Sequence, residues 1–262
     1  MALELSGRHA LVCGGSEGIG LATAQALAAR GASVTVLARR PERLRDVVAS
    51  LPTPDPSQRH GHVAADAGDA AGLRAAVDAL AAAQPVHILV NNTAGPPGGP
   101  AHGADPEAYV AVFRQHLVAG QVLVQAVLPG MRASGWGRIV NVISTSVKEP
   151  IANLGVSNTI RGAVASWAKT LASELGPDGI TVNNVLPGYT RTQRLDQILA
   201  ERAAATGKPA DEIARGMLAT VPAGRFAEPA EVAAAIAFLA SPAAGYVNGI
   251  NLPVDGGRTK SL

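Results

Sequence analysis

Short apolar segments alternate with helical patterns along the whole chain. Four of these segments, at residues 9–15, 33–39, 86–92 and 137–144, are almost continuously apolar instead of alternating with polar residues. A strand that is apolar throughout is buried on both faces, which is typical of a parallel sheet covered by helices on each side. The pattern therefore predicts an α/β fold with three α/β/α layers.

The remaining segments continue this alternation. Further strands are predicted at residues 62–66, 179–188 and 249–257, and helices at residues 20–31, from 41 onward, and at 70–83, 105–133, 162–176 and 229–241. No change of composition marks a domain boundary, so residues 1–262 are expected to form a single domain. A polar helical segment at residues 189–223 is inserted after the sixth strand. It is either a lid over a binding site or a surface helical hairpin.

Composition excludes several classes of function. The net charge is +2, which is too small to indicate binding to nucleic acid or to an anionic membrane. Cys13 is the single cysteine, so no internal disulfide is expected. No apolar run approaches the ~18 residues of a membrane span, and the first residues do not read as a signal peptide. A cytoplasmic protein is expected.

A glycine-rich turn follows the first strand and opens the first helix. It reads CGGSEGIG, with Gly14, Gly18 and Gly20 in the pattern Gly-x-x-x-Gly-x-Gly. Glycine allows a tight turn and lets a diphosphate approach the free N–H groups at the helix N-terminus. This position at the start of the chain favours nucleotide binding over a purely structural turn.

Taken with other motifs, this spacing resembles that of the short-chain dehydrogenase/reductase family, and of 3-oxoacyl-carrier-protein reductases in particular. The resemblance spans Leu5 to Gly257. It rests on the glycine turn, on NNTAG after the fourth strand, on Ser144 after the fifth, and on PGYTRT and VNGINLPVDGG further on. It implies a Rossmann-type doubly wound sheet of about seven parallel strands and a homotetramer.

The resemblance also implies a set of cofactor-binding positions. The positions for the diphosphate are Gly14, Ser16, Glu17, Gly18, Ile19 and Gly20, and those for the adenine are Asp66 and Ala67. The positions for the riboses are Asn92, Thr93, Ala94 and Arg161. The positions for the nicotinamide are Pro187, Gly188 and Thr192. The family has Asn-Asn-Ala-Gly where this chain has Asn-Asn-Thr-Ala-Gly. Either one residue is inserted, or Thr93 and Ala94 replace Ala and Gly.

The end of the second strand bears on the choice of cofactor. An NAD enzyme typically has an acidic residue there, whereas this chain has Ala38 followed by Arg39 and Arg40. Guanidinium groups match a 2′-phosphate, so NADP(H) is preferred, with NAD(H) as the alternative. Glu17 argues against this choice, because NADP-preferring members often have a basic residue at that position. The two arginines are alternatively solvated charges at a helix start.

The expected catalytic centre departs from the family pattern. The family's Tyr follows its Ser by thirteen positions and its Lys follows the Tyr by four, and from Ser144 these steps reach Ser157 and Arg161. The family's Asn on the long helix falls at His116. Ser144 is therefore the one member of the four that is retained, and its hydroxyl is expected to hold a substrate carbonyl oxygen.

The three replacements differ chemically from the residues that they replace. A phenol has a pKa near ~10 that a neighbouring cation can lower, whereas an aliphatic hydroxyl cannot be tuned in this way. Ser157 is therefore not expected to donate the proton, although it could order a water. His116, with an ordinary pKa near ~6.5, is expected to titrate in the working range. Lys148 and Tyr189 are further candidates near the site.

Each of these residues also has a structural interpretation. A histidine on a helix is more often structural, Lys148 is alternatively a solvated loop charge, and Ser157 and Asn158 are alternatively helix caps. The sequence shows no metal-ligand cluster.

We expect an NADP(H)-dependent oxidoreductase that interconverts a small carbonyl compound and an alcohol by an altered proton pathway. The alternatives are a reductase of a conjugated C=C or C=N bond and a cofactor-binding protein without turnover.

Overall fold

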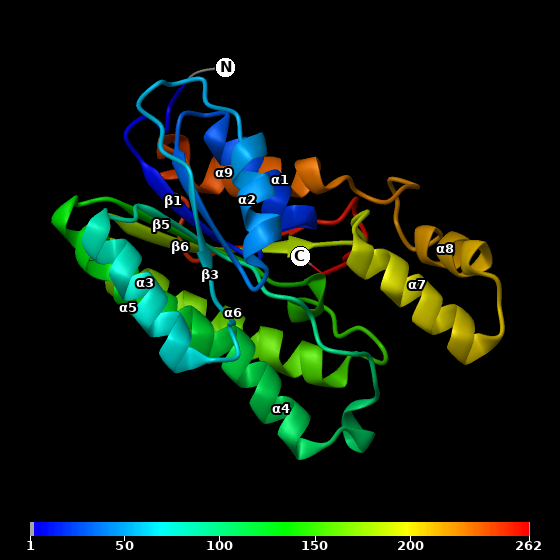
Figure 1. Cartoon of the computed structure of the whole chain (residues 1–262). Helices are drawn as coiled ribbons and strands as arrows, with labels where there is room; N and C mark the ends of the chain where they lie inside the picture. The colour runs from blue at the N-terminus through cyan, green and yellow to red at the C-terminus, as the bar shows by residue number, and fades with distance from the viewer. Residues whose placement is uncertain (1–2, 262) are drawn as a thin grey trace.

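The computed structural model describes residues 3–261 and contains a seven-stranded parallel sheet between two layers of helices (Figure 1). The strand order is β3-β2-β1-β4-β5-β6-β7. The strands are β1 (His9–Cys13), β2 (Ser33–Ala38), β3 (Gly61–Ala64), β4 (Ile88–Asn91), β5 (Gly137–Val142), β6 (Ile180–Pro187) and β7 (Asn251–Val254). The predicted doubly wound Rossmann-type sheet is confirmed.

One face of the sheet is covered by α1 (Gly18–Ala28), α2 (Pro41–Ser50) and α9 (Pro229–Leu239). The other face is covered by α3 (Ala70–Ala83), α5 (Ala119–Ala133) and α6 (Gly155–Leu175). Every residue of β1 and β5 is buried, as the continuous apolar pattern predicts. Two separate apolar clusters result, one between the sheet and each helical layer.

The long helix predicted at residues 105–133 is present but is not uniform. It consists of α4 (Pro106–Phe113), a π-helical turn at Arg114–Val118, and α5. By length and composition alone, Pro106–Ala133 could cross a membrane, although no segment of this kind is expected from the sequence. Half of its most apolar stretch is buried inside the fold. Packed in the same apolar cluster as α3 and α6, α5 serves as a core helix.

The insertion at residues 189–223 forms α7 (Gln193–Thr206) and α8 (Ala210–Leu218), which lie beside the layered body in Figure 1. Its two helices pack with Phe226, which follows the insertion, in a small apolar cluster where Leu195, Met217 and Phe226 are buried. This cluster is separate from the two main cores and supports the insertion. Its role as a lid stays a prediction.

An asparagine ladder crosses four neighbouring strands. Asn91, Asn141, Asn184 and Asn251 occupy paired positions of β4, β5, β6 and β7. Each side-chain Nδ2 donates to the Oδ1 of the next asparagine at 2.8 Å. A buried amide is stable only when its polar groups are paired, so the ladder fixes the relative positions of these strands close to the ends that carry the candidate site.

Candidate active site

The candidate site residues lie at the carboxyl ends of the strands. Gly14 follows β1, Thr93 follows β4 and Ser144 follows β5, while Pro187 ends β6. The chain order reverses between β1 and β4. Such a switch point is where open α/β sheets bind ligands.

The glycine turn between β1 and α1 is built around close backbone contacts. Gly14 and Gly18 have φ of +58° and +54°, in the left-handed region that favours glycine. A Cβ on Gly20 would lie 2.0 Å from the carbonyl oxygen of Gly14. The N-cap residue Glu17 makes no side-chain capping bond, and the first turn of α1 carries no acidic residue. The N-terminus of α1 is therefore suited to an anion.

Basic residues surround the far side of this turn. Arg39 and Arg40 are exposed after β2, where the sequence places them. Arg40 Nη2 lies 3.7 Å from Glu17 Oε2, so the acid that argues against a 2′-phosphate is paired with one of the two arginines. Arg43 Nε donates to the carbonyl oxygen of Ser16 at 3.4 Å. Sequence reasoning missed Arg43, which lies in the first turn of α2, shortly after Arg39 and Arg40.

The other predicted cofactor positions line the same edge of the sheet. Asp66 is exposed after β3, just before Ala67, and its Oδ1 accepts from the N–H of Gly68 at 2.9 Å. Asn92 Nδ2 donates to the carbonyl oxygen of Gly14 at 3.4 Å and thereby joins the ends of β1 and β4.

The segment after β6 closes on the glycine turn. Gly188 is packed so tightly that a Cβ there would lie 2.7 Å from Asp255 Cα. A Cβ on Gly18 would lie 3.1 Å from Thr192 Cγ2, so Thr192 borders the turn. The Thr192 hydroxyl also accepts from the N–H of Leu195 at 3.4 Å and caps α7.

Thr93 and His116, two departures from the family pattern, contact each other. Thr93 Oγ1 and His116 Nδ1 are 2.5 Å apart. The π-helical turn carries His116, which is buried, and its Nε2 has no partner among the described residues. The two positions that the resemblance marks as departures are thus joined by one hydrogen bond.

The expectation that His116 titrates near neutral pH is wrong. Burial, and then the charge of Arg161, lower the pKa of His116 to about 3, against a smaller opposing effect of the Ala94 backbone. The imidazole is therefore neutral in the working range. It can donate or accept a hydrogen bond but does not supply a proton as an imidazolium.

Ser157 and Arg161, one turn apart on α6, are linked directly. Arg161 Nε donates to Ser157 Oγ at 3.3 Å. Its Nη1 donates to the carbonyl oxygens of Ile143 at 2.9 Å and Val142 at 3.3 Å, the two residues before Ser144. Burial, and then the charge of Arg194, lower the pKa of Arg161 to about 10, so the guanidinium stays charged at neutral pH.

Ser144 lies between β5 and the short 3-10 turn at Thr145–Val147. Its Oγ accepts from the N–H of Ser146 at 3.0 Å. This bond uses a lone pair and leaves the hydroxyl proton available. Ser144 is thus prepared to donate to an oxygen of a bound molecule, and Arg161 secures the backbone immediately before it.

The capping alternative for Ser157 and Asn158 is not what the structure shows. Helix α6 begins at Gly155, earlier than predicted, and Leu154 is its N-cap. Asn158 instead binds the preceding loop: its Nδ2 donates to the carbonyl oxygen of Ile151 at 2.9 Å, and its Oδ1 accepts from the Ile151 N–H at 3.4 Å. Asn158 therefore holds the loop between Ser144 and α6.

The C-terminal segment closes over the loop that follows Ser144. Arg258 Nη1 donates to Thr145 Oγ1 at 3.2 Å, and its guanidinium carbon lies 4.9 Å from the centre of the Tyr189 ring. Glu149 Oε1 accepts from the N–H groups of Lys260 and Ser261 at 2.7 and 2.8 Å. Tyr189 is thus part of a packing contact, and half-buried Lys148 lies just before Glu149. Sequence reasoning missed Arg258.

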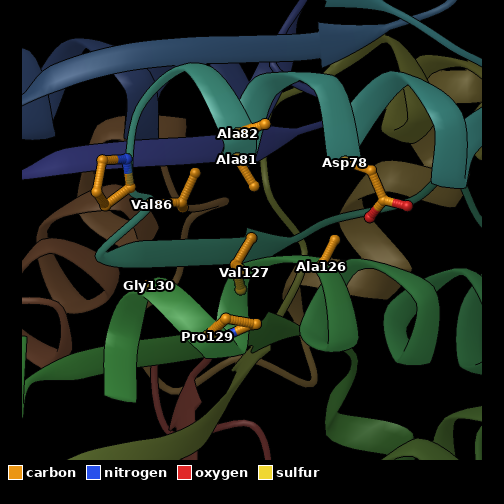
Figure 2. A pocket seen from close by; sticks show the side chains of 9 residues that line it. Asp78, Ala81, Ala82, Val86, Ala126, Val127, Pro129 and Gly130 are labelled. Carbon is orange, nitrogen blue, oxygen red and sulfur yellow. The ribbon is translucent and has the colours of Figure 1, made fainter. Parts of the chain in front are cut away.

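One pocket lies outside this site. An apolar pocket between α3 and α5, lined by Ala81, Val86 and Val127 with Asp78 at its rim, touches none of the candidate residues (Figure 2). Within residues 3–261, no group of three or more His, Cys, Asp or Glu side chains is placed to hold a metal ion.

Comparison with known proteins defines the class. Residues 14–259 match the family model described as enoyl-(acyl carrier protein) reductase. The chain is 37% identical over 258 residues to L-xylulose reductase of Cavia porcellus, covering 98% of each chain. It therefore belongs to the short-chain dehydrogenase/reductase family.

Two solved structures illustrate the likeness. L-sorbose reductase of Gluconobacter frateurii, complexed with NADPH and L-sorbose, has a TM-score of 0.92 at 31% identity, covering all of both chains. An actinorhodin polyketide ketoreductase variant with NADPH has a TM-score of 0.90 at 32% identity, covering 99% of this chain and 100% of that one. The predicted similarity to ketoacyl reductases is confirmed at the level of fold and family.

Proposed function

We propose that this protein is an NADP(H)-dependent oxidoreductase that interconverts a small carbonyl compound and an alcohol. The observation that carries the proposal is the juxtaposition of two parts. A glycine turn suited to a diphosphate lies at the end of β1, and Ser144 with Arg161 lies at the end of β5, with β4 between them. The NADPH-bound relatives support the choice of cofactor.

The residues present fit such a cofactor. The turn has no side chain at Gly14, Gly18 or Gly20, and the first turn of α1 is free of acids. Arg39 and Arg43 would approach a 2′-phosphate. The positions already named by resemblance, from Asp66 and Ala67 through Asn92, Thr93 and Ala94 to Pro187, Gly188 and Thr192, would hold the remainder. When bound, NADPH supplies the hydride.

The chain's own residues then handle the charge on the substrate oxygen. Ser144 Oγ donates a hydrogen bond to this oxygen, since the bond that it accepts from the Ser146 N–H leaves its proton unused. The Arg161 cation stabilises the negative charge that develops there. Ser157 positions Arg161 through its bond to Nε. The proton comes from water, because the pKa values of His116 and Arg161, about 3 and about 10, both lie far from neutrality.

A second candidate reaction is the reduction of a conjugated C=C bond. One observation favours it: the site offers fixed positive charge from Arg161, and neither Arg161 nor His116 has a pKa near neutrality. An enolate needs that stabilisation and takes its proton from solvent. The matching family model, which is named for enoyl reductases, supports the same alternative.

Turnover measurements distinguish three candidate functions: a carbonyl reductase, a reductase of a conjugated bond, and a cofactor-binding protein without turnover. Oxidation of NADPH is followed with a panel of ketones, conjugated enones and cyclic imines, and products are identified by mass spectrometry. Alcohol products support the first proposal, and saturated ketones support the second. NADPH binding without turnover of any member would contradict both and favour the cofactor-binding protein.

Cofactor preference is tested by fluorescence titration with NADPH and NADH. We expect NADPH to bind at least about tenfold more tightly. Arg39→Ala is expected to weaken NADPH binding about tenfold and to leave NADH binding unchanged. Arg45→Ala is the control, because Arg45 lies on the helix that directly follows Arg39 and pairs with Glu42 at the surface. Equal affinities for both cofactors would refute the preference.

We also propose a homotetramer. Phe238 on α9 is 46% exposed, and Tyr246, between α9 and β7, is fully exposed. Large apolar side chains on the surface often mark a contact with another chain. Light scattering at micromolar concentration is expected to give four times the chain mass, and Phe238→Glu is expected to lower it. A monomer in the unaltered protein would contradict this assembly.

A further inference from the structure

Two guanidinium groups face one open point beside the reaction centre. Gly95 lies in the loop after β4, and a Cβ on it would be 3.6 Å from Arg161 Nη2 and 4.0 Å from Arg194 Nε. Both guanidinium groups therefore border Gly95. Because glycine has no side chain, the space next to it that these two groups flank stays free for a small bound group.

Within residues 3–261, no carboxylate pairs with Arg161, and Arg194 has only a long pair with Glu201. The bonds of Arg161 go to Ser157 Oγ and to two backbone carbonyls, all uncharged. Arg194 Nη2 donates to the carbonyl oxygen of Pro96 at 2.7 Å, and its Nη1 is 3.9 Å from Glu201 Oε1 across partly exposed side chains. Such an exposed ion pair contributes little stabilisation to either charge. A buried positive charge without a counter-ion is unfavourable and favours an anionic ligand.

We propose that the substrate carries a carboxylate and that this carboxylate binds between Arg161 and Arg194. The inference rests on the proposed oxidoreductase function and names its substrate class, an oxo acid or the corresponding hydroxy acid. Planar guanidinium groups bind carboxylates with two parallel hydrogen bonds. The hydrogen bonds that fix the Arg161 side chain use Nε and Nη1. The Nη2 atom is therefore the one that faces the ligand.

The position of the pair favours the substrate over a cofactor phosphate. Arg161 Nη1 binds the carbonyls of Val142 and Ile143, so its guanidinium lies at the end of β5 beside Ser144. The diphosphate turn lies at the end of β1 and has the N-terminus of α1 as its own anion site. A carboxylate held by Arg161 would place the neighbouring carbonyl near Ser144.

The pair also joins the core to the insertion. Arg161 belongs to α6 in the core, whereas Arg194 belongs to α7 in the segment at residues 189–223. A carboxylate bound by both would hold α7 against the core. The proposed lid would thus close on charged substrates in preference to neutral ones.

An equilibrium binding experiment tests the site without requiring turnover. Calorimetric titrations of malonate and neutral malonamide are made into the protein–NADPH complex. We expect malonate to bind and malonamide not to bind, and we expect Arg194→Gln to weaken malonate about 10–100-fold. NADPH affinity should stay within about twofold. Arg215→Gln is the control, since Arg215 on α8 forms a comparable surface pair with Asp211 and should behave as the unaltered protein.

A kinetic experiment adds the reaction. Short oxo acids are compared with their methyl esters, and Arg194→Gln is expected to raise KM for the acids about 10–100-fold while leaving the esters unchanged. Equal binding of malonate to the unaltered protein and Arg194→Gln would overturn the proposal. So would a loss of NADPH affinity that matches the loss of malonate affinity, because the pair would then serve the cofactor. Malonate binding without reduction of any carbonyl would support the carboxylate site and contradict the oxidoreductase function.

Discussion

The two ends of the candidate site differ in how closely they follow the family. At the end of β1, the glycine turn keeps the spacing of its relatives, and close backbone contacts leave little freedom: a Cβ on Gly20 would meet the Gly14 carbonyl at 2.0 Å. At the end of β5, Ser144 stands where the resemblance implies a serine, whereas Ser157, Arg161 and His116 stand where it implies a phenol, an ammonium and an asparagine. The difference teaches that the backbone constrains the glycine turn, whereas at the end of β5 side chains define the candidate site and can be exchanged without changing the fold.

Ser144→Ala should have the largest effect, because it removes the hydroxyl proposed to bind the substrate oxygen. We expect turnover to fall by about 10²–10³, with NADPH affinity unchanged. Steady-state kinetics with the best carbonyl substrate and a fluorescence titration measure the two quantities. We expect the turnover of Ser157→Ala to fall by a smaller factor, because this variant loses only the hydrogen bond to Arg161. Full activity in Ser144→Ala would remove the basis for placing the reaction at the end of β5.

Gly20→Ala tests the end that follows the family. The added Cβ would be forced against the Gly14 carbonyl, so we expect a loss of about 3 kcal/mol in the free energy of unfolding and weaker NADPH binding. Gly216→Ala is the matched control, because nothing lies within 4 Å of a Cβ there and Gly216 is in a helix. It should gain about 0.5–1 kcal/mol. Equal stability of the two variants in urea would show that the turn is not tightly constrained.

The low pKa of His116 makes the protein acid-sensitive. The folded state keeps the imidazole neutral down to about pH 3, whereas the unfolded chain takes up a proton below its ordinary value of 6.5. Stability from this group is therefore complete above pH 6.5 and is lost as the pH falls toward 3, by about 2 kcal/mol at pH 5. Urea unfolding at pH 7 and pH 5 should show that His116→Asn reduces this loss. An identical loss in the variant would contradict the shift.

The bond between Thr93 and His116 is expected to couple the two departures. In a double-mutant cycle with Thr93→Val and His116→Asn, we expect a coupling of about 1 kcal/mol in the free energy of unfolding. Thr159→Val with His116→Asn serves as the control cycle, because Thr159 bonds only to the backbone of its own helix. Additive effects in the first cycle would show that the two replacements are independent.

The fold could be predicted from the sequence because a parallel sheet buried on both faces leaves a continuous apolar signal. The glycine turn could also be predicted, since backbone constraints appear directly as residue type. The pKa of His116 could not be predicted, because it depends on burial and on the charge of Arg161, which lies 45 positions further along the chain. The pairing of Arg161 with Arg194 and of Thr93 with His116 likewise depends on loops whose paths no periodic pattern specifies.

The central claim is that Arg161 fixes positive charge at the reaction centre and that neither Arg161 nor His116 titrates near neutrality. The dependence of kcat/KM on pH tests this most directly, with a substrate that does not itself ionise in the range. Because His116 and Arg161 have pKa values of about 3 and about 10, a flat profile is expected from about pH 5 to pH 9, and the same flat profile in His116→Asn. An inflection near neutral pH that disappears in His116→Asn would contradict the account.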